Sequence, residues 1–207
     1  MIAIIDYDMG NLRSIAKALE HVGGTVIVTR DPETIARAEK IVLPGVGAFR
    51  DGISHLETEG MKEALNREVR ENKKPLLGIC LGMQLLADKS YEFGAGEGLG
   101  YIHGEVHRFA GDNLRVPHVG WNAVSVRTPH VLFSGIPADA DFYFVHSYHL
   151  VCERTEDVLA TCEYGGSFVA AIARDNIVAT QFHPEKSQKH GLRLLKNFVA
   201  WTGESVC

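Results

Sequence analysis

The chain has 207 residues with 26 acidic and 21 basic side chains, a formal net charge of −5, and 45% hydrophobic residues. This length predicts a single domain, residues 1–207, that buries about 70% of its extended surface without disulfides or metals. The acidic balance argues against a duplex nucleic-acid binder, and no apolar run approaches the ~20 residues of a membrane helix. We therefore expect a cytoplasmic protein with reduced cysteines, namely Cys80, Cys152, Cys162 and Cys207.

The first half of the chain alternates short strands with helices. Runs of apolar or β-branched residues predict strands at 2–6, 25–29, 40–43 and 75–79. Apolar residues at helical spacing predict helices near 12–22, 32–36, 49–56, 61–69 and 81–87. Asn11 is suited to cap the first helix. This alternation predicts an α/β fold with a central, mostly parallel sheet flanked by helices.

The second half is rich in β-strands. A glycine-rich stretch at 89–111 is followed by predicted strands at 123–126, 142–145, 158–163, 168–172 and 177–180. These segments predict an antiparallel β-rich extension, either at the edge of the main sheet or as a small second sheet. An apolar stripe over 192–199 predicts a final helix.

The strongest chemical signal is the segment Gly78-Ile79-Cys80-Leu81-Gly82, between a predicted strand and a predicted helix. A nucleophile between spaced glycines is typical of a nucleophile elbow, which exposes that side chain at the carboxyl end of a sheet. A helix N-terminus favours the Cys80 thiolate, and the Leu81 N–H would point at the oxygen of an attacked carbonyl. The alternative is a small core cysteine between two packing glycines.

A nucleophilic thiol requires a general base and a group that orients this base. His183-Pro184-Glu185 supplies both after the last predicted strand, at the sheet edge where the elbow is expected. Pro184 keeps the backbone extended, so Glu185 can hold one imidazole nitrogen while the other faces the thiol. In α/β-hydrolases the acid precedes the histidine, which disfavours that class. The alternative is a turn histidine beside a proline.

A third segment, Pro44-Gly45-Val46-Gly47, follows a predicted buried strand and leads into a helix. Glycines in such a turn let backbone N–H groups approach a ligand, so this segment could supply a second oxyanion donor. A βα turn without a ligand is the alternative.

Together these motifs resemble the class I, triad-type glutamine amidotransferases over essentially the whole chain. Three features are similar to one branch, the glutaminase subunits of imidazole glycerol phosphate synthase. They are Asp6-Tyr7 with Gly10-Asn11-Leu12, the segment Pro117-His118-Val119-Gly120-Trp121-Asn122, and Lys186 between Glu185 and Ser187. Asp8 departs from the family pattern, which commonly has glycine at that position.

The resemblance implies hydrolysis of glutamine to glutamate and ammonia through a Cys80 thioester, with His183 as base and then acid and Glu185 orienting it. The implied oxyanion site comprises Val46, Gly47 and Leu81. The implied substrate-binding residues are Gly45, Gln84, Glu92, Ser147 and Tyr148. No cofactor or metal is implied.

The resemblance also implies a partner, a (β/α)8 cyclase subunit that forms a heterodimer with this chain and uses the ammonia in histidine biosynthesis. We expect the cyclase to dock at Trp121, Asn122 and Lys186. The alternatives are a glutaminase that serves another synthase and a non-catalytic binding protein of the same fold. Three filled triad positions argue against the second alternative.

Overall fold

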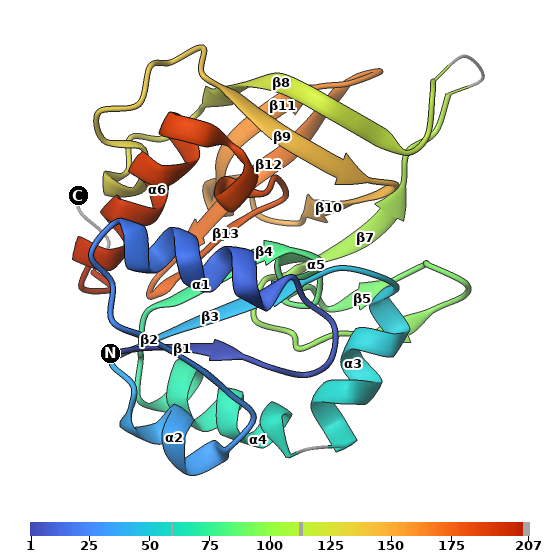
Figure 1. Cartoon of the computed structure of the whole chain (residues 1–207). Coiled ribbons are helices and arrows are strands. Elements are labelled where there is room, and N and C mark those ends of the chain that lie inside the picture. Colours follow the sequence, from blue (N-terminus) through green and yellow to red (C-terminus); the bar gives the residue numbers. More distant parts are fainter. Residues whose placement is uncertain (59, 112–113, 205–207) are drawn as a thin grey trace.

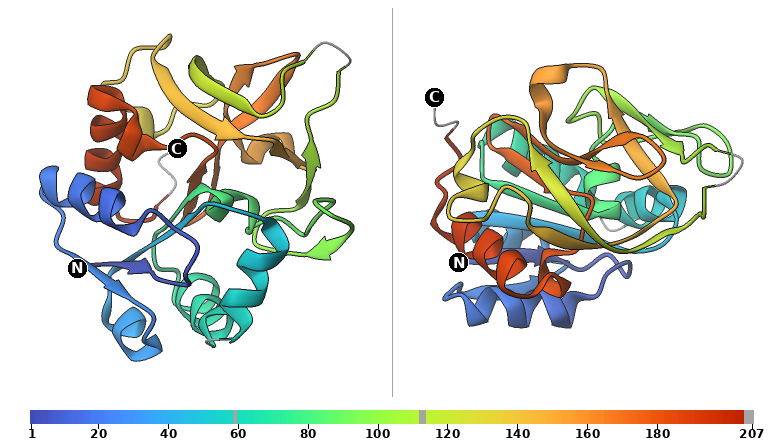
Figure 2. Two further views of the ribbon diagram at one scale, coloured as in Figure 1. Left: turned by 45° about the vertical axis from the view of Figure 1, so that its right-hand side comes forward. Right: turned by 90° about the horizontal axis from the view of Figure 1, so that it is seen from above.

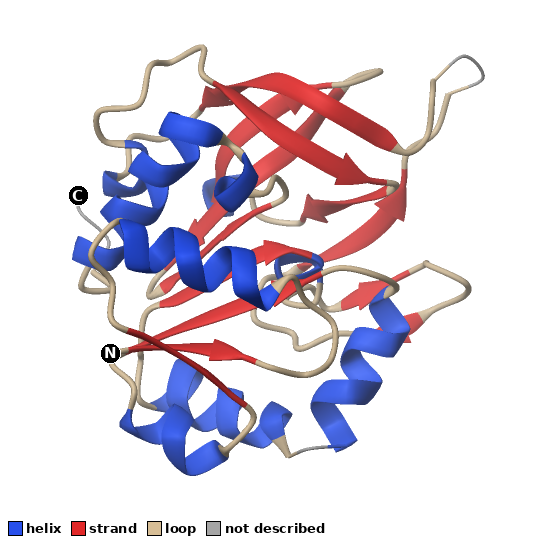
Figure 3. Cartoon of the chain, viewed as in Figure 1, coloured by secondary structure: helices blue, strands red, loops and turns tan. Residues whose placement is uncertain are grey.

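The computed structural model describes residues 1–58, 60–111 and 114–204. A nine-stranded sheet runs through the molecule in the order β2-β1-β3-β4-β13-β12-β11-β8-β9 (Figure 1). Helices gather around its first half, whereas the other half consists mostly of strands and loops (Figure 3). The predicted α/β class is therefore confirmed. No helix in the described part of the chain is long and apolar enough to span a membrane.

The parallel half of the sheet positions the predicted motifs. Its five strands are β1 (Ile2–Ile5), β2 (Val26–Thr29), β3 (Lys40–Gly45), β4 (Leu76–Cys80) and β13 (Ile177–Thr180). Every residue of β1, β4 and β13 is buried, as expected for strands covered on both faces. Because parallel strands end at one edge, the segments that follow β3, β4 and β13 meet there.

Helices cover both faces of this half (Figures 1 and 2). One face carries α1 (Leu12–His21) and α6 (Gln188–Ala200). The other carries α2 (Pro32–Arg37), α3 (Phe49–Thr58), α4 (Met61–Leu65) and the π-helical turn η1 (Asn66–Glu71). Neighbouring strand residues alternate between the two cores, so Ile4 packs in the first core and Ile5 in the second.

The second half of the chain extends the sheet with antiparallel strands. These are β12 (Ser167–Arg174), β11 (Val158–Glu163), β8 (His118–Val126) and β9 (Asp141–His146). A separate four-stranded sheet contains β10 (Tyr148–Cys152), β7 (Gly104–Arg108), β5 (Lys89–Ser90) and β6 (Gly96–Glu97). The short helical turns are η2 (Val131–Phe133), η3 (Thr155–Asp157) and η4 (Pro184–Lys186). Both arrangements left open by the sequence therefore occur.

The helix predicted over residues 81–87 is shorter than expected, because α5 covers only Leu81–Gln84. The glycine-rich stretch accounts for the difference. The N–H groups of Leu99, Tyr101 and Gly100 donate to the carbonyls of Leu85, Leu86 and Ala87, respectively. These bonds satisfy the three carbonyl groups that would otherwise accept hydrogen bonds from the next turn of a longer helix.

Two further expectations concern Asn11 and the cysteines. Asn11 occupies the N-cap position of α1, but its side chain makes no capping hydrogen bond there. Cys80, Cys152 and Cys162 carry free thiols, while Cys207 lies outside the described residues.

Candidate active site

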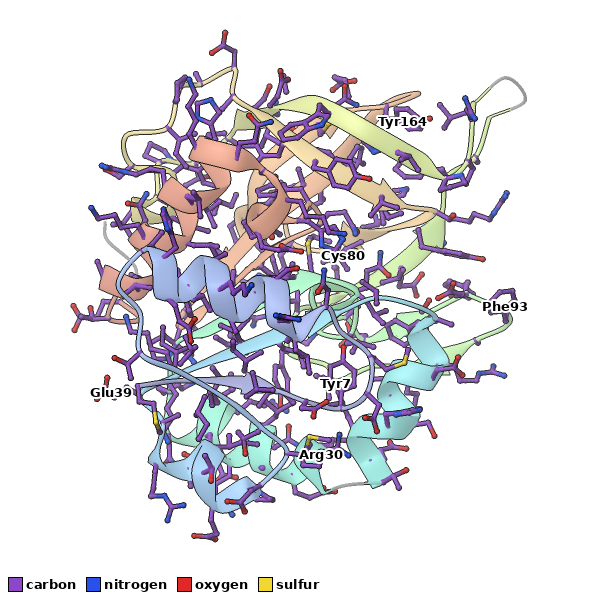
Figure 4. The ribbon with its side chains drawn as sticks, in the orientation of Figure 1. Tyr7, Arg30, Glu39, Cys80, Phe93 and Tyr164 are labelled. Atoms are coloured by element: carbon purple, nitrogen blue, oxygen red, sulfur yellow. The ribbon has the colours of Figure 1, made fainter. Side chains whose placement is uncertain are left out.

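Cys80 lies at a strained turn between β4 and α5, near the middle of the molecule (Figure 4). Its backbone angles, φ 54° and ψ −110°, are unusual for a residue with a side chain and match the predicted nucleophile elbow. A Cβ on Gly82 would overlap the Leu43 carbonyl, and a Cβ on Gly78 would lie 3.0 Å from the Ala179 Cβ. Glycine is therefore required at 82, and a side chain at 78 would need its neighbours to shift.

His183 and Glu185 meet at the same edge, directly after β13. The His183 Nδ1 lies 2.8 Å from the Glu185 Oε1, and these side chains are 3% and 1% exposed. The His183 Nε2 is buried and makes no hydrogen bond within the described residues. Burial by itself would lower the pKa of His183, but the nearby Cys80, the hydrogen bond with Glu185 and the charges of both groups raise it to about 9. An imidazolium is thus favoured beside the thiol.

The charge of His183 contributes more to the surroundings of Cys80 than the dipole of the short helix α5 does. Because α5 has only four residues, it aligns few peptide dipoles behind Cys80, fewer than the predicted longer helix would have supplied. The positive charge beside Cys80 therefore comes chiefly from the His183 imidazolium.

Two polar residues that the sequence analysis did not single out complete this arrangement. The Ser187 Oγ donates to the His183 carbonyl at 2.6 Å and accepts the Tyr143 N–H at 3.0 Å, which fixes the turn that carries His183 to β9. The Gln181 Nε2 lies 3.7 Å from the Cys80 Sγ. Neither residue belongs to a motif of its own, so the signal that could have revealed them is that both lie close to His183 in the sequence.

The loop after β3 differs in detail from the expected oxyanion site. The Val46 N–H donates to the Met9 carbonyl at 2.8 Å, so this group is engaged and cannot bind an oxyanion in the conformation observed. Gly47 has φ +110°, which favours glycine, and Val46 is 42% exposed. At Gly45 a Cβ would overlap the hydroxyl of Tyr7, which donates to the Pro44 carbonyl at 2.6 Å.

A cavity of about 400 Å³ opens onto Cys80. Its lining contains eight of the predicted site residues besides the cysteine, namely Val46, Gly47, Leu81, Gln84, Glu92, Ser147, Tyr148 and Lys186. A smaller neighbouring void is bordered by Gly45, His183 and Glu185. The fold thus brings residues from five separate chain segments to one place.

Two of the predicted substrate-binding side chains already have protein partners. The Gln84 Nε2 donates to the Tyr148 carbonyl at 2.8 Å and to the Gln181 Oε1 at 3.0 Å, so its carbonyl oxygen is the atom left for a ligand. The Glu92 Oε2 accepts the Phe49 N–H at 2.7 Å, at the start of α3. Both residues therefore line the cavity and also bond to the protein segments around it.

Of the residues expected at the partner interface, Lys186 lines this cavity and Trp121 is joined to it through Tyr143, whereas Asn122 lies on the opposite face of β8, where it bonds the buried His118. Trp121 is 45% exposed and packs edge-on against Tyr143, with 5.9 Å between ring centroids. The Lys186 Nζ lies 5.7 Å from the centroid of the same tyrosine ring. Trp121, Tyr143 and Lys186 thus form one continuous patch at the cavity mouth.

Asp8 adopts φ 63°, the left-handed conformation that glycine tolerates best. Its carboxylate accepts from the Arg30 Nη2 at 2.8 Å, and the same nitrogen lies 2.9 Å from the Asp6 carboxylate. This pairing lowers the pKa of Asp8 and ties down the loop that carries the Met9 carbonyl.

The family model for the class-I glutamine amidotransferases matches residues 3–201. The subunit HisH of imidazole glycerol phosphate synthase from Syntrophotalea carbinolica is 53% identical, over 96% of this chain and 98% of its own length. The corresponding HisH 1 subunit from Campylobacter jejuni is 50% identical, over 96% of this chain and 99% of its own.

Solved structures agree on the fold. A putative GMP synthase protein from Thermoplasma acidophilum superposes with a TM-score of 0.72 at 20% identity, covering 96% of this chain and 92% of that one. PurLQS from Thermotoga maritima gives 0.70 at 18% identity, covering 96% and 97%. The chain belongs to the class-I glutamine amidotransferase family, in the branch of the HisH subunits of imidazole glycerol phosphate synthase.

Proposed function

We propose that this protein is the glutaminase subunit of imidazole glycerol phosphate synthase, in which residues 1–207 act as one cytoplasmic amidotransferase domain. It hydrolyses glutamine to glutamate and ammonia and passes the ammonia to a synthase partner for histidine biosynthesis. The observation that carries this proposal is the 2.8 Å His183–Glu185 contact beside a cysteine held at a strained elbow.

The proposed reaction begins when the Cys80 thiolate attacks the carboxamide carbon of glutamine. The tetrahedral intermediate places its negative charge on the former carbonyl oxygen, near the Leu81 N–H. His183 then gives its proton to the departing nitrogen, so the C–N bond breaks, ammonia leaves and a thioester remains. Water attacks the thioester as His183 removes its proton, which releases glutamate and restores the thiolate.

Glu185 supports both steps by holding the Nδ1 of His183, which orients the Nε2 towards Cys80 and stabilises the imidazolium. We assign Val46 and Gly47 to the second half of the oxyanion site, which requires the Val46 N–H to leave the Met9 carbonyl. We assign Gln84, Glu92 and the Ser147-Tyr148 backbone to the amino-acid end of glutamine, with Gly45 allowing close approach. The place of Gln84, Glu92, Ser147 and Tyr148 in the wall of the cavity beside Cys80 supports the assignment.

The proposed partner is a (β/α)8 cyclase subunit that binds over the patch of Trp121, Tyr143 and Lys186, in contact with the strand segment that includes Asn122. The exposed tryptophan and the adjacent lysine suit an apolar contact with an acidic residue nearby. No cofactor enters the proposed reaction.

The test is release of glutamate from glutamine by the full chain mixed with the cyclase subunit and its substrate, with Glu185→Gln as the matched variant. Glutaminase activity in the mixture, and at least a tenfold loss in Glu185→Gln at about neutral pH, are the expected results. Absence of glutamate release from the mixture would overturn the proposed function. Activity with a different synthase in place of the cyclase would overturn the partner.

A further inference from the structure

Two buried histidines outside the proposed triad face each other across β8 and β9. His118 and His146 are directly opposite in the strand register and are 2% and 6% exposed. The ring of Tyr164 stacks on His118 with 4.0 Å between centroids, and Phe109 lies 5.2 Å from His146. Polar rings in such apolar surroundings need hydrogen-bond partners, because leaving them unpaired is costly.

Hydrogen bonds join these rings into a chain. The Asn122 Nδ2 lies 2.8 Å from the His118 Nε2, and the His118 Nδ1 lies 3.0 Å from the His146 Nε2. The His146 Nδ1 lies 2.8 Å from the Tyr148 carbonyl oxygen. We call these three side chains and the carbonyl the histidine relay.

The direction of the relay follows from its ends. A carbonyl oxygen can only accept, so the proton of His146 sits on Nδ1 and its Nε2 accepts from the His118 Nδ1–H. The His118 Nε2 is then bare and accepts from the Asn122 amide. Burial lowers the pKa of His118 to about 4 and that of His146 to about 3, so each ring is neutral and carries one proton.

The inner end of the relay reaches the cavity wall. The Tyr148 carbonyl also accepts from the Gln84 Nε2 at 2.8 Å, so two donors fix its orientation. Gln84 continues to Gln181, whose Nε2 lies beside the Cys80 Sγ. His146 itself lines the cavity.

We propose that His146, oriented by His118 and Asn122, is a positioning residue for glutamine. It holds the Tyr148 carbonyl so that Gln84 and the Ser147-Tyr148 backbone present a fixed surface to the substrate. Because Asn122 lies in the proposed docking segment, the relay links that segment to the substrate cavity. This role deepens the proposed function and rests on it.

The first test reads the protons directly and needs no activity. In the full chain labelled with ¹⁵N-histidine, the ring nitrogens of His118 and His146 should report neutral Nδ1–H forms at pH 7. The common Nε2–H form at His146 would overturn the relay, because its Nδ1 would then face the Tyr148 carbonyl without a proton.

The second test measures substrate positioning with matched variants. His146→Leu removes the donor but keeps the bulk, whereas His146→Asn keeps an amide N–H near the position of Nδ1. The probe is a chloroketone analogue of glutamine that labels Cys80, with iodoacetamide as the small control reagent. The readouts are the analogue concentration that gives half the maximal labelling rate, and the iodoacetamide rate.

We expect His146→Leu to raise that concentration at least about tenfold, because the Tyr148 carbonyl loses one of its two donors. The iodoacetamide rate of His146→Leu should stay within about threefold of that of the unaltered chain. In His146→Asn both the half-saturating concentration and the iodoacetamide rate should lie within about threefold of the values of the unaltered chain. Equal effects of the two variants, or no effect of either, would overturn the positioning role. A parallel fall in the iodoacetamide rate would overturn it too, since it would mean that His146 acts on the thiol.

If His146→Leu does not fold, His118→Phe replaces it, because the phenyl ring keeps the stacking and removes the nitrogen that orients His146. The same half-saturating concentration should then rise at least about threefold. Failure of the unaltered chain to be labelled by the analogue would overturn the proposed function and with it the positioning role, whereas the nitrogen signals would still report the relay.

Discussion

Docking of the proposed cyclase, with its substrate bound, should activate the glutaminase by freeing the Val46 N–H. In the structure of the chain alone this group donates to the Met9 carbonyl at 2.8 Å, so the loop lacks one oxyanion donor. Val46 lies between Gly45 and Gly47, and such flanks let a peptide rotate at little steric cost. A partner that favours the rotated loop would complete the site.

Two quantities bound the size of this activation. Rotation leaves the Met9 carbonyl without its donor, which costs about 1–3 kcal/mol, so the free chain adopts the rotated form in a small fraction of molecules. One oxyanion donor lowers the barrier by about 2.7–4 kcal/mol, or 10²–10³ in kcat. A tenfold change corresponds to about 1.4 kcal/mol, so we expect activation of at least about tenfold, and the upper rotation cost of about 3 kcal/mol limits it to about 150-fold.

The assay is glutamate release by the chain alone, with the cyclase, and with the cyclase and its substrate. Cys80→Ala supplies the background rate in each mixture. Equal rates in the three mixtures would refute this reasoning about Val46 while leaving the triad assignment intact.

The remaining predictions concern the thiols and the base. Chloroketone analogues of glutamine should label Cys80 and spare Cys152 and Cys162, because burial raises the pKa of each of these two thiols to about 12. Peptide mapping of the labelled protein shows which cysteine carries the label. The pKa of His183 is raised from 6.5 to about 9. Its protonation therefore stabilises the folded state fully below pH about 6.5, and this contribution to the unfolding free energy is lost as the pH rises through about 9. The unfolding free energy of the unaltered chain should therefore fall over that range relative to His183→Gln, and parallel curves would contradict the pairing.

The parts predicted from sequence are those set by local pattern. The apolar runs before Cys80 and His183 predicted β4 and β13, and the parallel order of those strands explains why both motifs end at one edge. Glycines at 78 and 82 predicted the sharp turn, which the backbone of Cys80 shows. Such features depend on a few neighbouring residues, so they can be recognised in a linear sequence.

The missed parts depend on register and on distant partners. The His118–His146 contact exists because β8 and β9 pair with these residues opposite each other, which no spacing within either strand reveals. The engaged Val46 N–H depends on the Met9 carbonyl from another loop. The end of α5 likewise depends on hydrogen bonds from residues 99–102. Composition and periodicity carry no information on these contacts.

The most direct test of the central claim compares two nitrogen sources in the complex of this chain with the proposed cyclase. With Cys80→Ala, synthesis from glutamine should fall to background, because the thiol is needed to release ammonia. Synthesis from added ammonium salts should continue at the rate of the unaltered complex, since the partner carries out that step. Loss of both activities would contradict the claim that Cys80 acts as the nucleophile of a separate glutaminase, and retention of both would contradict any role of Cys80 in releasing ammonia.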